Sequence, residues 1–159
     1  MIRNFEKDIL EKMNFANRFL SIKGSALPLN EVSTFKKNEI IKIFHELGYT
    51  CKFEKGGWYE IEKKFEEYLF SLSFQIKYNA PLIYPYVYKK GNLIDSGLGH
   101  FSYMLNFLNY DKDLIDSNFR INTLSDLKRF ICEIVSLFDE FCNIYIQEIQ
   151  DGKNPEYIN

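Results

Sequence analysis

The chain has 159 residues, of which 46% are hydrophobic and 26% charged, and this composition of an ordinary globular protein argues against wholesale disorder. Its length suits a single domain, residues 1–159, that can bury a core without a disulfide or metal staple. The net charge is −2, and the negative charge is concentrated in the second half, where residues 101–159 carry 10 Asp and Glu against 5 Lys and Arg. This distribution argues against nucleic-acid binding by that half.

Two helices are predicted before the first extended segment. Apolar residues recur every three or four positions from Ile2 to Leu20, which indicates an amphipathic helix. A break containing glycine and proline follows. A second helix is predicted from about Ser33 or Asn38 to Leu47, with Gly48 in the position after the helix that favours a left-handed backbone.

The glycine pair Gly56-Gly57, set between two extended runs, predicts a β-hairpin. A two-residue loop would pair Phe53 with Glu60 and leave both faces mixed. A three-residue loop, with Gly57 at positive φ, pairs Phe53 with Tyr59 and leaves one face apolar. Because a slip of one residue inverts every side chain, we expect the three-residue loop.

The second face of that hairpin is then polar, apart from one tryptophan. It carries Thr50, Lys52, Glu54, Trp58, Glu60 and Glu62. Lys52 is predicted to lie opposite Glu60. The tryptophan could project into solvent among these carboxylates or be buried under a helix that covers this face.

Further strands follow the hairpin. Residues 70–78 alternate strictly between apolar and small polar side chains, as in a strand with one face on the core. Residues 82–89 form another predicted strand, placed at a sheet edge because Pro85 cannot donate a ladder hydrogen bond. The face taken by its tyrosines, Tyr84, Tyr86 and Tyr88, is left open. A short strand, Leu93–Asp95, completes the series.

The C-terminal part is predicted to be mainly helical. A short helix is expected over residues 101–108, followed by a polar surface loop to Asn122. Thr123 and Asp126 have the spacing of a helix N-cap. The apolar residues from Leu124 to Tyr145 then step by three and four, so a long helix should reach about Gln150 and stop at Gly152.

These elements predict an α+β fold. We expect a mainly antiparallel sheet of four to five strands, with two N-terminal helices and the long C-terminal helix packed mostly on one of its faces.

The cysteines and the N-terminus indicate a cytoplasmic protein. Cys51, Cys132 and Cys142 are odd in number and include no C-x-x-C pair. The N-terminal residues lack the continuous apolar run of a signal peptide, and no stretch reaches the ~18 apolar residues of a membrane span. We therefore expect a reduced protein that does not enter a membrane.

The sequence contains no cofactor motif, and its possible catalytic residues are few. Asp95, Ser96 and His100 place an acid, a hydroxyl and an imidazole close together, but the members of a catalytic triad usually come from separate parts of the chain. His45 lacks the second histidine of a zinc-protease helix, and no metal site is predicted. We expect a protein that is not an enzyme.

Two patches are predicted to bind a protein partner. The first is Trp58 with Glu54, Glu60 and Glu62, because aromatic anchors dominate binding hot spots and an acidic rim steers a basic partner. The second consists of Asp111, Asp113 and Asp116.

In size, single-domain character and excess of acidic residues, the chain resembles the immunity proteins of bacterial toxin–immunity pairs. The resemblance covers the whole chain and includes no motif, so no site residue is carried over. It implies a monomeric inhibitor that neutralises a cognate toxin, such as a basic toxin domain, by direct binding. The alternatives are a small hydrolase or nuclease using Asp95, Ser96 and His100, and a regulatory homodimer built on the apolar seam from Leu124 to Tyr145.

Overall fold

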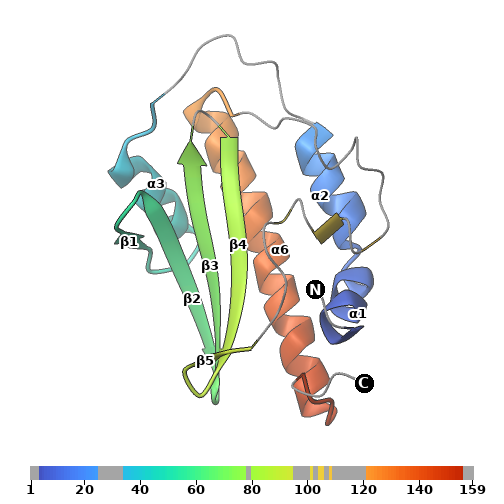
Figure 1. Cartoon of the computed structure of the whole chain (residues 1–159). Helices are drawn as coiled ribbons and strands as arrows, with labels where there is room; N and C mark the ends of the chain where they lie inside the picture. The colour runs from blue at the N-terminus through green and yellow to red at the C-terminus, as the bar shows by residue number, and fades with distance from the viewer. Residues whose placement is uncertain are drawn as a thin grey trace.

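The computed structural model describes residues 4–24, 34–77, 80–94 and 121–155, together with Phe101, Met104, Leu105 and Leu108. A five-stranded antiparallel sheet has the strand order β1-β2-β3-β4-β5 and is combined with helices α1, α2, α3 and α6. Figure 1 shows α6 running behind β3 and β4, with α1 and α2 on the far side of α6 and α3 beside β1 and β2. The predicted α+β fold is confirmed.

The N-terminal segment forms two helices where the sequence predicted one. Helix α1 spans Asn4–Lys12 and α2 spans Phe15–Gly24. Between them Asn14 has a φ of 53°, a left-handed conformation that asparagine tolerates better than most residues. This break in the helix allows Leu10 and Phe15, on successive helices, both to enter the core. The single helix expected over residues 2–20 is therefore wrong.

Helix α3 spans Lys37–Glu46 and ends as predicted. Gly48 follows it with a φ of 90° and donates its N–H to the carbonyl of His45 at 3.0 Å. The N–H of Tyr49 bonds to the carbonyl of Phe44 at 3.1 Å, which satisfies another orphaned carbonyl of the last turn.

The hairpin has the predicted three-residue turn. Strand β1, Lys52–Glu54, pairs with β2, Trp58–Phe65, so that Phe53 lies opposite Tyr59 and Lys52 opposite Glu60. Gly56 and Gly57 have φ values of 90° and 85°. The turn therefore requires the conformational freedom of glycine at both positions.

Strands β3, Tyr68–Lys77, and β4, Ala80–Lys89, form the longest pair of the sheet. Strand β5 is only Asn92–Leu93 and pairs with Tyr88 and Lys89. Strand β4 is therefore the edge of the described sheet along most of its length, as predicted from Pro85, but β5 covers its last two residues.

Helix α6 spans Leu124–Gln150 and matches the prediction closely. Its N-cap Thr123 accepts a hydrogen bond from the Asp126 N–H at 3.1 Å, and Gly152 has a φ of 85° just past its end. The apolar seam packs on the sheet: the ring centroids of Phe130 and Phe74 are 6.3 Å apart. Except for the exposed Leu124, the seam residues are buried, so this surface is used inside the chain and not for a coiled coil.

Candidate functional site

The two faces of the sheet differ in chemistry. Because side chains alternate along each strand, the pairing register assigns every residue to one face. The inner face holds the buried aromatic and aliphatic side chains that pack on the helices. We call the opposite surface the outer sheet face; its central residues are Trp58, Glu60, Glu62, Ser71, Ser73, Tyr84, Tyr86 and Tyr88. Among the described residues, every helix packed on the sheet lies on the inner side (Figure 1).

Trp58 lies on the outer sheet face and is half-buried. Its indole meets the ring of Tyr84 edge to face, with centroids 5.7 Å apart and planes at 70°. Gln75 Nε2 donates to the Gly56 carbonyl at 2.6 Å, which ties the turn before Trp58 to β3. The indole therefore makes an aromatic contact across β3 next to an anchored turn.

The tyrosine row of β4 shares the face with Trp58. Tyr84, Tyr86 and Tyr88 are half-buried, while the residues that alternate with them, Ile83, Pro85 and Val87, are buried. The rings of Tyr86 and Tyr88 lie 6.4 Å apart at 39°. Burial, the neighbouring tyrosines and the charge of Glu60 raise the pKa of Tyr86. The question that the sequence left open is thus answered: the row forms part of the outer sheet face.

The predicted glutamates surround these rings. Glu54 is exposed and lies opposite Trp58 on the neighbouring strand. Glu60 and Glu62 lie two residues apart on β2, so both side chains are on this face, and Lys52 Nζ lies 3.2 Å from Glu62 Oε2. Partial burial, together with the Glu62 carboxyl, raises the pKa of Glu60. Glu60 therefore holds its proton to a higher pH than an ordinary glutamate, on the face that carries the tryptophan and the tyrosines.

Several predicted site residues fall outside the described residues. These are Asp111, Asp113 and Asp116 of the second patch, and Asp95, Ser96 and His100 of the possible catalytic group. His45 is exposed on the last turn of α3. Within the described ranges, no three His, Cys, Asp or Glu side chains gather closely enough to hold a metal ion.

The three cysteines are free, and two of them are buried. Burial raises the pKa of the Cys51 thiol to about 11 and that of the Cys142 thiol still further. These two groups are therefore neutral near pH 7 and poor nucleophiles.

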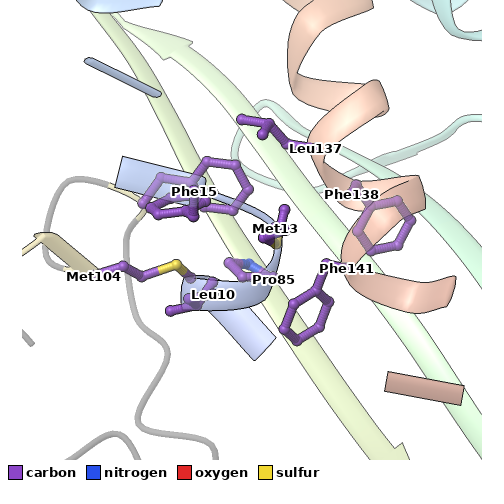
Figure 2. A pocket seen from close by; sticks show the side chains of 9 residues that line it. Leu10, Met13, Phe15, Pro85, Met104, Leu137, Phe138 and Phe141 are labelled. Carbon is purple, nitrogen blue, oxygen red and sulfur yellow. The ribbon is translucent and has the colours of Figure 1, made fainter. Parts of the chain in front are cut away.

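An apolar cavity of about 10 Å³ lies where α1, α2, β4 and α6 meet. Figure 2 shows Leu10, Phe15, Pro85 and Phe141 among the side chains around it. A volume this small is at the lower limit for one water molecule, and all of its lining residues are apolar. It is a packing defect of the core, so we place the candidate site on the outer sheet face.

Ser71 belongs to this site and was not singled out from the sequence. The alternation over residues 70–78 already assigned it to the polar face, but its burial depends on Glu62 and Tyr86, which flank it on the two adjacent strands. Only the register across three strands shows that it is enclosed.

No family model, curated protein or solved structure matches this chain. No helix among the described residues is both long and apolar enough to cross a bilayer.

Proposed function

We propose that this chain is a non-enzymatic protein-binding module that docks a partner on its outer sheet face, and that it acts as an immunity protein neutralising a bacterial toxin in the cytoplasm. The observation that carries the proposal is the composition of that face. One tryptophan and three tyrosines lie beside a group of carboxylates on a surface that no described helix covers.

Physical chemistry supports docking over a purely structural role for these side chains. Half-buried Trp and Tyr residues supply large contact areas at a small cost in side-chain entropy, and they dominate the energetics of protein interfaces. Glu54, Glu60 and Glu62 add negative charge near the rings, which favours and steers a basic partner. The neutral buried thiols and the absence of a metal-binding cluster among the described residues leave this face as the best-supported site.

Co-expression tests the proposal directly. The gene immediately upstream is expressed in a bacterial host with and without this chain, and the two products are co-purified. We expect the upstream product to arrest growth, this chain to restore growth, and the two proteins to form a stoichiometric complex. Arrest that this chain does not relieve, or purification with nucleic acid alone, would refute the proposal.

Surface variants then locate the interface. Trp58→Ala should weaken the complex about 30-fold, the loss typical of a hot-spot residue. Glu54→Lys, which changes an exposed side chain without altering packing, should also weaken it. Glu133→Lys, at an exposed position on α6, is the matched control. A complex in which both outer-face variants bind as tightly as the control would place the interface elsewhere.

A further inference from the structure

Ser71 is a buried polar side chain in the middle of the outer sheet face. It lies opposite Glu62 on β2 and opposite Tyr86 on β4. The side chain is 2% exposed, and its Oγ has no hydrogen-bond partner in the part of the chain that the structure describes. A buried hydroxyl in this state is unfavourable, so a residue of this kind needs an explanation.

The groups around Ser71 are mainly hydrogen-bond acceptors. The Glu60 and Glu62 carboxyls lie on one side and the Tyr86 ring on the other. The titratable side chains that share this face across β1, β2 and β4 are Lys52, Glu54, Glu60, Glu62, Lys64, Tyr84, Tyr86 and Tyr88. Lys52 bonds to Glu62, and the charge of Glu60 acts on Tyr86.

We infer that Glu60, Glu62, Ser71 and Tyr86 form a subsite for one arginine side chain of the protein partner. The inference rests on the proposed function, because it assumes that a protein docks on this face. A guanidinium group carries five N–H donors in one plane, so once it enters between the Glu62 and Tyr86 side chains that enclose Ser71 it can bond to the carboxylates and to the serine hydroxyl together. Its flat face also stacks on a tyrosine ring, whereas a lysine ammonium is a compact, strongly hydrated charge.

The titration of Glu60 gives the subsite a pH dependence. In the free protein, burial and the Glu62 carboxyl raise the pKa of Glu60, so Glu60 holds a proton more readily than an ordinary glutamate does. A bound guanidinium favours both carboxylates in the ionised form and expels that proton. Arginine binding therefore becomes tighter as the pH rises through the pKa of Glu60 in the free protein.

The test uses amide NMR titrations of the full chain with Nα-acetylarginine methylamide. The matched citrulline compound, which is neutral and nearly isosteric, and the matched lysine compound serve as comparisons. We expect saturable shifts at residues 58–62, 71–73 and 84–88 with arginine, and none with citrulline. No shift with arginine, equal shifts with citrulline, or tighter binding of the lysine compound would overturn the assignment.

Two variants separate this role from a structural one. Ser71→Ala removes the unsatisfied hydroxyl, so the melting temperature should hold or rise while arginine binding weakens. Glu60→Gln should weaken arginine binding about tenfold. Glu133→Gln, which makes the same charge change on α6, should have no effect. If Ser71→Ala and Glu60→Gln bind arginine as the wild type does, the subsite is wrong.

The same variants distinguish the subsite from the proposed function. If Trp58→Ala weakens the complex with the partner while Glu60→Gln and Ser71→Ala change nothing, the docking face stands and the arginine subsite fails. If the chain binds arginine as expected but every outer-face variant binds the toxin as tightly as the wild type does, the toxin does not dock on the outer sheet face and the proposed function is wrong in that respect.

Discussion

Tyr49, just after α3, donates a hydrogen bond from its hydroxyl to the Asp139 carboxylate in the middle of α6. The contact ties the N-terminal half of the chain to its longest helix. Burial and the aspartate raise the pKa of this tyrosine, so it remains a neutral donor at every pH at which the protein is handled.

Tyr49→Phe should therefore lower the free energy of unfolding by about 1–2 kcal/mol, because the Asp139 carboxylate loses a charge-assisted hydrogen bond. Urea denaturation measures the change. In Asp139→Asn the amide oxygen still accepts the hydrogen bond, so the decrease in the free energy of unfolding should be smaller. A Tyr49→Phe variant as stable as the wild type would show that water replaces the hydroxyl at no cost.

Glu148 on α6 receives ion pairs from Lys12 on α1 and Lys153 beyond the end of α6. Hydrogen bonds from Lys12 and then Lys153 lower the pKa of Glu148. The pKa of Glu148 is thus lower in the folded chain than in the unfolded chain. The stabilisation from its two ion pairs is therefore complete above the unfolded pKa of about 4.3, and it is lost as the pH falls through the folded pKa.

We expect Glu148→Gln to lower the melting temperature at pH 7 by about 2–4 °C. The difference from the wild type should shrink as the pH drops below about 4.3, where the unfolded chain takes up the proton. Calorimetry across this range measures both effects, and Glu133→Gln controls for the loss of one negative charge. A difference that is constant at every pH would contradict this account.

Glu60 should show the opposite pH dependence. Its pKa is raised in the folded state, so the destabilisation of the fold grows as the pH rises from the unfolded pKa of about 4.3 and is complete above the folded pKa. Glu60→Gln should raise the melting temperature at pH 7 by about 1–2 °C, by removing like-charge repulsion on one sheet face.

The gain from Glu60→Gln should disappear below about pH 4.3, where glutamate is neutral in both states. Thermal melts followed by circular dichroism at several pH values can detect where the melting temperatures of the variant and the wild type become equal. Loss of stability in this variant at pH 7 would mean that the charge of Glu60 is favourable in the fold.

Asn14, between α1 and α2, has a left-handed backbone conformation. Asn14→Ala should lower the free energy of unfolding by about 1 kcal/mol, since a side chain with a Cβ and no local polar group disfavours this region. Asn14→Gly should remain within about 0.5 kcal/mol of the wild type.

The side chain of Asn14 also accepts a hydrogen bond from Asn17 at 2.9 Å, which both variants remove. Asn17→Ala removes the same bond and leaves the backbone requirement in place, so it is the control in urea denaturation. Equal losses in Asn14→Ala and Asn14→Gly would show that the hydrogen bond matters and the backbone does not.

The parts of the fold that local patterns determine were predictable. The turn at Gly56 and Gly57 followed from a test of two registers against the side chains, because only one register separates polar from apolar residues. The limits of α6 followed from a cap, a long apolar stripe and a terminal glycine. Each of these signals lies within a few residues of the element that it defines.

The break between α1 and α2 at Asn14 was not predicted, because the apolar residues keep their helical spacing across it. Phe15 is buried against residues of β4 and α6, and both of these elements are distant from it in sequence. Nothing next to Asn14 indicates that packing.

The candidate site was predicted in part. Trp58 and its glutamates were assigned to the correct face, since that depends on the hairpin alone. The contact with Tyr84 and the enclosure of Ser71 require the pairing of β2, β3 and β4, which a single sequence does not specify.

The order of elements along the chain has a consequence for biosynthesis. The sheet is complete at β5, whereas α6, which covers much of its apolar face, follows only after the intervening segment. In a growing polypeptide, α3 is already present to contact Phe74 through Phe44, but Phe70, which packs on Tyr145 of α6, lies on a surface that is still uncovered. Until the last helix emerges, that surface is open to chaperones and to association with other nascent chains.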